Sequence, residues 1–281
     1  MRLVKNTVIR NVTVSSDNGH GVNLHGTENA VIDGLTVEKA GKAGISLANT
    51  VNVTIENTEA LSENCSWGSV AMMFAEGEAY ENPVSIVYGE GNDIDYIYAD
   101  ERNAEGYEGV NSIHFEAEYS GAIAGDIREV SVSEGVDVPE TFKYAASVNG
   151  AYFTTINGAV EAANDGDTVK CAPGTYDENI VFGDKSITLE GAQAGVKPDG
   201  ETRTDDSQET ILTGTVSTAN GGTTADDFNA DQKIVVDGFK FEGDGLKVGD
   251  CSYSTAGSLT VKNCIMTFGD NGEDTIEGYG N

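Results

Sequence analysis

Apolar and polar residues alternate with a period of two along most of this chain, and short blocks of that alternation recur. Three blocks align without gaps, beginning at Ile9, Ile32 and Ile55, which places them 23 residues apart. Two further blocks begin at Val236 and Val261, 25 residues apart. Each block reads apolar, any residue, Asn or Gly, apolar, any residue, apolar, apart from one polar substitution in the third block. The pattern predicts short strands that recur in a regular array.

The third residue of each block predicts a sharp bend in the strand. A strand that continues past an abrupt corner needs one residue with φ above zero, and Gly and Asn tolerate that conformation best. Apolar residues on either side of the corner then point into one interior. The predicted corners are Asn11, Gly34, Asn57, Gly238 and Asn263.

The length of the repeat predicts a coil with three short strands in each turn, since an extended residue rises roughly 3.3 Å. Helical repeats of the ankyrin or tetratricopeptide kind are excluded because the apolar period is two and not 3.6. We therefore expect an all-β fold in which each turn of the coil, or rung, pairs with the next one and like residues stack.

At these blocks the chain resembles the pectate-lyase-like superfamily of right-handed parallel β-helices, including the surface or adhesin-type β-helix repeat proteins of bacteria. The resemblance covers Met1 to about Phe74 and again about Tyr152 to the end. It implies a right-handed parallel β-helix, or solenoid. It leaves function open, because that scaffold carries lyases, hydrolases, esterases, phage spikes and adhesins.

The repeat divides the chain into four parts. Residues 1–75 are expected to form the last rungs of a first β-helix. In residues 76–128 the register of 23 is lost although short strands remain, which predicts a β-rich extension that covers the exposed edge of the last rung. Residues 129–143 are expected to be a linker, and residues 144–281 the start of a second β-helix.

The second β-helix is expected to begin with a hairpin and one short helix. Asn149-Gly150 is a strong signal for a tight β-turn. A helix is predicted from about Thr155 to Ala163, with Ala159 on its apolar face, and Asp165-Gly166 ends it. This segment resembles the capping helix and first rungs of pectinesterase-type β-helices, which implies that the helix plugs the open end of the core.

The amino-acid composition argues against several classes of partner and site. With 16 basic against 47 acidic residues, the net charge is −31, and such a field repels nucleic acid and anionic lipid. No apolar stretch reaches the roughly 18 residues of a membrane-spanning helix. Four cysteines without a CxxC pair argue against a tetrathiolate zinc site, while a Cys251–Cys264 disulfide and buried free thiols both stay open.

Gly19-His20-Gly21 is the one motif that suggests catalysis. Polygalacturonase-like glycosidases carry such a motif on a rung, where the His supports a pair of carboxylates, and this resemblance would make His20 catalytic. Only Asp17 lies nearby upstream, and Ile45–Asn49 replaces the family's Arg-x-Lys substrate clamp. Hydrolysis needs two converging carboxylates. We therefore assign no catalytic residue, and His20 remains the alternative.

Two places suggest a weak calcium site. Asp33 and Glu56 are expected to stack on adjacent rungs, about 5 Å apart, where two carboxylates could hold a hard cation. Asp270 and Asp274 lie in a partial match to the calcium-binding nonapeptide of toxin-type β-rolls. Besides these two places, the long acidic loops of residues 197–209 and 223–231 are candidates that lack EF-hand spacing. Solvated carboxylates explain all of these equally simply, so we assign no metal or cofactor.

A sugar-binding surface is the remaining candidate site. Trp67 is the only Trp, and His20 and His25 are expected two rungs away from it. Exposed aromatic rings stack on sugars, which makes His20, His25 and Trp67 candidate carbohydrate contacts. The alternative is a Trp that closes the core.

These observations favour a non-catalytic section of a large secreted or cell-surface bacterial β-helix protein, acting as a stalk or adhesive module. Its expected partner is a glycan or a host surface, and as a piece of a longer chain it is expected to be monomeric. The alternative is a fragment of a polysaccharide lyase or glycoside hydrolase whose catalytic rungs lie elsewhere. A protein from a halophile, in which acidity is general, is a further alternative.

Overall fold

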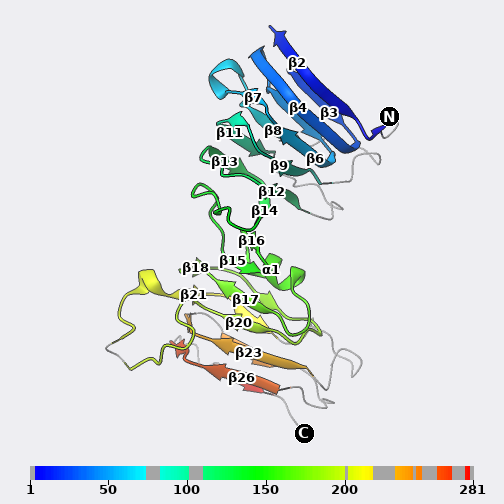
Figure 1. Cartoon of the computed structure of the whole chain (residues 1–281). Coiled ribbons are helices and arrows are strands. Elements are labelled where there is room, and N and C mark those ends of the chain that lie inside the picture. The colour runs from blue at the N-terminus through cyan, green and yellow to red at the C-terminus, as the bar shows by residue number, and fades with distance from the viewer. Residues whose placement is uncertain are drawn as a thin grey trace. The chain divides into compact units, whose positions relative to one another are not determined.

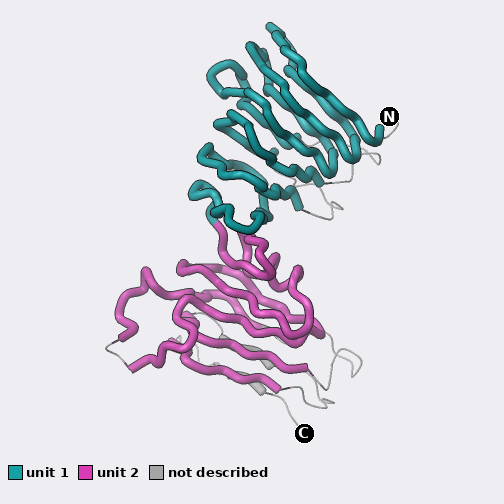
Figure 2. Tube along the Cα trace, viewed as in Figure 1, with its two compact units in different colours: residues 1–143 teal, residues 144–281 magenta. Residues whose placement is uncertain are grey.

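The computed structural model divides the chain into two compact units, residues 1–143 and residues 144–281 (Figure 2). The structure describes residues 4–73, 83–100, 110–199, 202–217, 232–242, 245–248, 258–267 and 276–278. Almost all regular elements are strands, and nearly all of these pair in parallel (Figure 1), so the predicted all-β fold with a parallel coil is confirmed. The second unit begins at the residue where the sequence predicts the second coil.

Unit 1 consists of short strands that stack rung upon rung. Its elements are β1 (Val4–Lys5), β2 (Val8–Ser16), β3 (Val22–His25), β4 (Thr27–Ala40), β5 (Ile45–Ala48), β6 (Val51–Glu56), β7 (Glu59–Ala60), η1 (Ser62–Asn64), β8 (Val70–Met73), β9 (Ser85–Tyr88), β10 (Asp93–Ile94), β11 (Tyr96–Ala99), β12 (Asn111–Phe115), β13 (Ala122–Gly125) and β14 (Ile127–Val132).

The repeat of 23 residues corresponds to one turn of this coil. Ile9 of β2 pairs with Ile32 of β4, and Ile32 pairs with Ile55 of β6. On the opposite side of the interior, Ile45 and Leu47 of β5 occupy the equivalent positions to Val22 and Leu24 of β3. The middle rungs bury these side chains almost completely. Like residues stack along the coil, and the stacked columns form the core.

The five predicted corners all adopt the left-handed conformation. The φ angles are 54° at Asn11, 72° at Gly34, 49° at Asn57, 78° at Gly238 and 50° at Asn263. At Gly34 a β-carbon would lie 2.7 Å from the Asn11 side-chain oxygen of the preceding rung, so the corner has no room for a larger residue there.

A second column of asparagines with left-handed backbone conformation is present that the sequence pattern does not predict. Asn6, Asn29 and Asn52 have φ angles of 58°, 56° and 56°, and they recur at the same interval of 23 residues. The Asn52 amide donates to the Asn29 side-chain oxygen at 3.2 Å. The segment before each apolar block therefore bends as well, although no apolar pattern marks it.

The extension predicted at residues 76–128 is wrong, because the described strands of this segment continue the coil. β9 pairs in parallel with β6, β12 with β9, and β14 with β12. On the other sheet β11 pairs with β8 and β13 with β11. The register of parallel strands depends on which side chains point inward and not on the length of the connections between rungs. Rungs of different length can therefore still stack in one coil. β14 also places residues 129–132 of the predicted linker in the last rung.

Aromatic side chains fill the interior of the last rungs of unit 1. The rings of Tyr88, Phe115 and Tyr119 lie 5.2 to 5.4 Å apart between centroids. The Tyr119 hydroxyl donates to the Ala122 carbonyl at 3.0 Å. Burial, together with the nearby charge of Asp93, raises the pKa of Tyr88 to about 12. These rings supply the bulk that Ile and Val supply in the earlier rungs.

Unit 2 repeats the coil with three parallel sheets. Its elements are β15 (Ala146–Val148), β16 (Ala151–Phe153), α1 (Ile156–Ala162), β17 (Thr168–Cys171), β18 (Gly174–Tyr176), β19 (Ile180–Val181), β20 (Thr188–Glu190), η2 (Asp206–Gln208), β21 (Thr210–Leu212), β22 (Thr215–Ser217), β23 (Lys233–Asp237), β24 (Phe239–Phe241), β25 (Gly245–Val248), β26 (Ser258–Lys262), β27 (Ile265–Met266) and β28 (Ile276–Gly278). The parallel sheets follow the orders β17-β20-β23-β26, β18-β21-β24-β27 and β19-β22-β25-β28.

The unit opens with the predicted hairpin and helix. Asn149 and Gly150 both have positive φ, and they join β15 to β16 as an antiparallel pair. In α1, Ile156, Ala159 and Val160 are buried against the core of the unit. With seven residues α1 is far too short to cross a membrane, and no helix among the described residues is long and apolar enough to do so.

Opposite charges hold the two ends of α1. Thr155 caps the first turn, and the Glu178 carboxylate accepts the backbone N–H groups of Ile156 and Asn157 at 3.0 Å each. At the other end the Lys185 ammonium donates to the carbonyls of Val160 and Glu161 at 3.0 and 2.6 Å. An anion at the amino end and a cation at the carboxyl end both complement the helix dipole. The helix is thereby fixed over the first rung.

Substituting Asp for Ala159 tests the role of α1 as a plug. Ala159 is fully buried, so an Asp there places an unpaired carboxylate against the core of the first rung. We expect the free energy of unfolding, measured by urea titration with circular dichroism, to fall by at least about 3 kcal/mol. The matched control is Ala162→Asp on the exposed face of the same helix, which we expect to stay close to wild type. Equal stability of both variants would contradict the packing of this helix.

Candidate functional site

The Gly19-His20-Gly21 motif forms a bend that stacks on the equivalent bend of the next rung. The Gly21 N–H donates to the Ala43 carbonyl at 3.1 Å, and the Gly44 N–H donates to the Gly68 carbonyl at 3.1 Å. A β-carbon on Gly21 would lie 2.6 Å from the Gly44 carbonyl oxygen. Close stacking of backbones therefore accounts for Gly21 without any catalytic role.

This stacking brings His20 and Trp67 together. The two residues precede Gly21 and Gly68 in the stack, with Ala43, which is fully buried, on the rung between them. Their ring centroids lie 5.4 Å apart, and the rings meet edge to face at 80°. The Lys42 ammonium lies 4.9 Å from the centroid of the Trp67 ring. Trp67 remains 43% exposed, so it does not close the core.

The surroundings of His20 favour its neutral form. Burial lowers its pKa most, and the charges of Lys42 and His25 lower it further, against a smaller opposing effect of the Ala43 carbonyl. No carboxylate is among these influences. Asp17, the acidic residue nearest in sequence, is engaged by the Lys39 ammonium at 2.5 Å. The paired carboxylates that glycoside hydrolysis requires are therefore not found around His20 among the described residues.

The carboxylate of Asp33, which stacks beside Glu56 on the next rung, takes part in the corner of the coil. The two residues are register partners, as the repeat predicts. One oxygen of Asp33 accepts the Asn57 amide at 2.9 Å, and the other accepts the Arg10 guanidinium at 2.7 Å. These two hydrogen bonds, with Asn57 contributing most, hold the pKa of Asp33 below its ordinary value. The side chain proposed for a cation thus links three successive rungs.

Unit 2 uses the same arrangement at its own corner. Asp237 precedes Gly238, and one of its oxygens accepts the Asn263 amide at 2.7 Å and the Gly195 N–H at 3.2 Å. The Lys262 ammonium lies 3.0 Å from the other oxygen. Burial raises the pKa of Asp237, but these hydrogen bonds outweigh it and hold the pKa below its ordinary value. Asp before a corner Gly, with Asn at the next corner, is thus a structural motif shared by both units.

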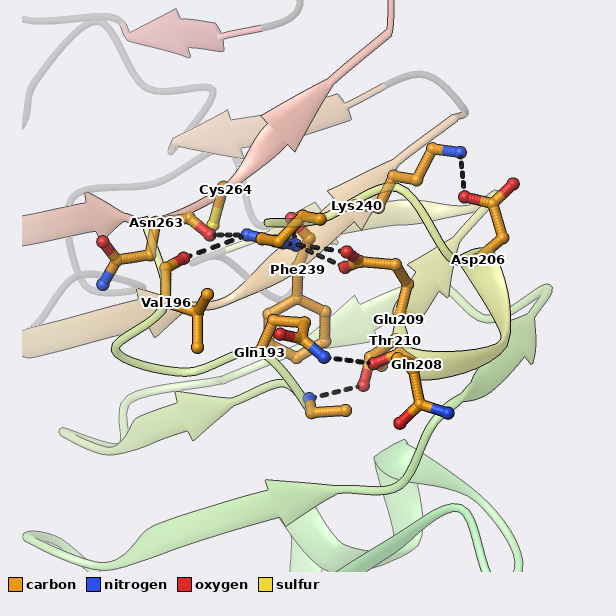
Figure 3. Close-up of polar contacts among 12 residues, drawn as sticks. Gln193, Val196, Asp206, Gln208, Glu209, Thr210, Phe239, Lys240, Asn263 and Cys264 are labelled. Atoms are coloured by element: carbon orange, nitrogen blue, oxygen red, sulfur yellow. Dashed lines mark hydrogen bonds and ion pairs between the residues drawn. The ribbon is translucent and has the colours of Figure 1, made fainter. Parts of the chain in front are cut away.

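A buried ion pair holds the long segment between β20 and β21 to the coil. The side chains of Arg203 and Glu209 are 0% and 2% exposed, and Arg203 Nε donates to Glu209 Oε1 at 2.8 Å. The same guanidinium donates to the carbonyls of Asn263 and Phe239, the latter at 3.3 Å. Figure 3 shows the Glu209 carboxylate on one side of these contacts and the Val196 and Asn263 carbonyls on the other. Through these carbonyls, the ion pair ties the segment to two successive rungs, those of Phe239 and Asn263.

The other aspartates of this segment, all of which the structure describes, are also engaged, and Asp199 accepts the backbone N–H and the hydroxyl of Thr202 at 2.8 Å each. Asp205 accepts the backbone N–H of Ser207 at 3.0 Å and its hydroxyl at 2.7 Å. Asp206 accepts the Lys240 ammonium at 2.9 Å, as Figure 3 shows. These contacts leave the acidic stretch 197–209 without an assembled cation site in the part that the structure describes, which contains no group of three His, Cys, Asp or Glu side chains placed to hold a metal. Asp270, Asp274 and residues 223–231 lie outside the described residues.

The cysteines of the described residues are free thiols whose surroundings disfavour the thiolate. Cys65, Cys171 and Cys264 are free, and burial raises the pKa of each. The thiol is then the dominant form at neutral pH, which disfavours metal binding and nucleophilic attack. Cys251, the proposed partner of Cys264, lies outside the described residues.

Comparison with known proteins adds one finding. A family model described as a right handed beta helix region matches residues 2–113. This match includes most of the rungs of unit 1, among them β9 and the first three residues of β12 beyond the three regular repeats. No curated protein and no solved structure matches the chain.

Breaking the buried ion pair tests its part in unit 2. Arg203→Met leaves the Glu209 carboxylate buried and unpaired, and we expect a loss of about 3 to 5 kcal/mol in the free energy of unfolding. The double variant Arg203→Met with Glu209→Leu should recover most of that loss. The control Lys240→Met removes two more exposed ion pairs, with Asp206 and Glu242, and should cost no more than about 1 kcal/mol. A single variant as stable as the wild type would exclude this role for Arg203.

Proposed function

Because a family model of right-handed β-helices matches residues 2–113 and the described strands of each unit form a parallel β-coil, we propose that the chain is a structural, non-catalytic section of a larger secreted or cell-surface bacterial protein. In this role the coil is a stalk that carries other parts of the protein, in an extracellular setting and without a cofactor. Its partner is a glycan or a host surface.

One observation carries the proposal: the carboxylates on the coil that are best placed for chemistry are engaged in holding rungs together. Asp33 and Asp237 bridge the corners. Asp95 accepts the Ser62 hydroxyl and N–H at 2.6 and 2.8 Å and the Ser69 hydroxyl at 2.5 Å. A carboxylate that already accepts several hydrogen bonds is a poor general base, because its pKa is low and its lone pairs are occupied.

The charge of the chain supports the same proposal. A net charge of −31 keeps copies of a coil apart in solution and opposes collapse onto other acidic surfaces. Rungs of this kind add length by repeating the same contacts, and each contacts only its neighbours. A stalk needs these two properties and no active site.

We expect the chain to cleave no glycan. The enzyme alternative requires two placed carboxylates or a metal-assisted base, and His20 has neither around it in the described part of the chain. The trial incubates the purified chain, with and without calcium, on polygalacturonate and on a panel of plant and host glycans. We expect neither reducing ends nor unsaturated products. Product release that His20→Ala abolishes would replace this proposal with the lyase or glycosidase alternative.

A specific observation favours an adhesive role in addition to the stalk. Trp67 offers an exposed indole whose position is fixed by the His20 ring and the Lys42 ammonium. A fixed aromatic face with polar neighbours suits the apolar face of a sugar ring. His25 contributes to the electrostatics of His20 and lies on the same part of the coil.

Replacing Trp67 tests this second role. If the chain binds a glycan on an array, Trp67→Ala should reduce the affinity by about tenfold or more, because it removes the stacking surface. The matched control is Tyr144→Ala, since Tyr144 is an aromatic residue of unit 2 that is 38% exposed. Binding that survives Trp67→Ala, or that both substitutions weaken equally, would exclude this site as the adhesive surface.

A further inference from the structure

Two tyrosines of β11 extend the surface on which Trp67 lies. Tyr96 and Tyr98 alternate with the buried Ile97, so both side chains are on the outer face of their strand, and neither is fully buried. Their ring centroids lie 6.1 Å apart and the rings are nearly parallel, at 13°. β11 pairs in parallel with β8, the strand that begins shortly after Trp67 (Figure 1). The three aromatic residues therefore come from two neighbouring rungs.

The Tyr96 ring lies against the residue that follows Trp67. A β-carbon on Gly68 would lie 2.5 Å from Tyr96 Cδ1 and 3.0 Å from Cε1, so the ring occupies the space that any larger residue would need. Gly68 also has a φ of 97°, a conformation that glycine adopts most readily. The bend that presents the indole thus also provides the surface on which the Tyr96 ring rests.

The Tyr98 ring leans over β8 as well. Tyr98 is the register partner of Ala71, and its hydroxyl donates to Met73 Sδ, two residues further along β8, at 3.5 Å. The small side chain of Ala71 leaves room for a ring that reaches from one strand to the next. A ring that leans in this way turns one face to the sheet and the other outward. We call Trp67, Tyr96 and Tyr98 the aromatic strip.

The charges around the aromatic strip favour an uncharged ligand. Burial, and then the charge of Asp100, raise the pKa of Tyr98 to about 12, so its hydroxyl is neutral at neutral pH. Asp95 is a second carboxylate beside the strip, since it directly precedes Tyr96. The Lys42 ammonium supplies one positive charge at the indole. Because the whole chain carries a net charge of −31, its field opposes the approach of a polyanion.

We infer that the aromatic strip binds a neutral glycan chain of several sugar units. Tyrosine centroids 6.1 Å apart are too far from each other for one sugar ring to stack fully on both, so successive units of a chain contact successive aromatic residues. Flat aromatic rings suit a chain with equatorial linkages, such as β-1,4-linked glucose or N-acetylglucosamine, because the apolar faces of its sugars are open to stacking. This inference rests on the adhesive role proposed for Trp67. It assigns the choice of chain length to Tyr96 and Tyr98.

Calorimetric titration with β-1,4-linked oligomers of glucose and of N-acetylglucosamine tests the inference. We expect the affinity to rise by about tenfold or more from the dimer to the hexamer. A hexamer of galacturonate, the acidic probe, should not bind. Because Trp67 is the only Trp of the chain, a change in its fluorescence during the titration locates the bound oligomer at the strip.

Substitutions separate the tyrosines from Trp67. Tyr96→Leu and Tyr98→Leu keep apolar side chains over β8 but remove the rings, and the double variant should bind the hexamer no more tightly than the wild type binds the dimer. The matched control is the double variant Tyr144→Leu with Tyr152→Leu, since these tyrosines also form a pair, with centroids 4.9 Å apart in unit 2. This control should keep the affinity of the wild type. Circular dichroism checks folding, and the two single variants replace a double variant that does not fold.

Failure of this inference is distinguishable from failure of the adhesive role. Equal affinities for dimer and hexamer, a Tyr96 and Tyr98 double variant that keeps the preference for the hexamer, or galacturonate binding as tight as that of the neutral oligomers would overturn the inference and leave the Trp67 site standing. The same holds if neither neutral series binds while another glycan of the array binds through Trp67. If no glycan binds at all, the adhesive role falls and the inference falls with it.

Discussion

Every rung of this coil must turn at the same place as the rung beneath it, and that requirement governs the structure. Parallel strands keep their register only if the bends between them coincide. The residue at each bend must therefore have positive φ and must fit against the corner residue of the next rung. Asn and Gly meet both conditions, and the columns Asn11–Gly34–Asn57 and Gly238–Asn263 are the result. The Asp that precedes a corner Gly then accepts the amide of the Asn above it, in both units.

The fold could be predicted where the repeat is regular, because apolar spacing and corner residues are both visible in a single sequence. The same holds for the hairpin at Asn149-Gly150 and for α1, whose turn residues and apolar face are local signals. The rungs after β8 could not be predicted. Ile86 of β9 pairs with Val53 on one side and with Ile113 on the other, yet the connections between these strands differ in length. A repeat of constant length is therefore not visible in this part of the sequence, although the inward-pointing side chains of successive strands stay in register.

The candidate site was partly predictable for the same reason. The repeat places His20 two rungs away from Trp67, and in the structure the stack of glycines brings their rings into contact. Lys42 gave no signal, because a single basic residue in a loop is common. Arg203 gave none either: its carbonyl partners at Phe239 and Asn263 lie 36 and 60 residues further along the chain. The acidic stretch around it suggested calcium, whereas ion pairs and a turn engage those carboxylates.

The contacts of Arg203 also have a consequence for the order of events during synthesis. A chain made from its amino end exposes Arg203 and Glu209 early, and the two can pair as soon as both have left the ribosome. The guanidinium gains its remaining acceptors only after β24 and then the Asn263 corner have been added. Until then a charged group destined for a dry interior remains in water, at no cost of desolvation. The guanidinium therefore becomes buried only after the later rungs have been added. In a nascent chain that ends before Asn263, this part of unit 2 remains exposed to solvent.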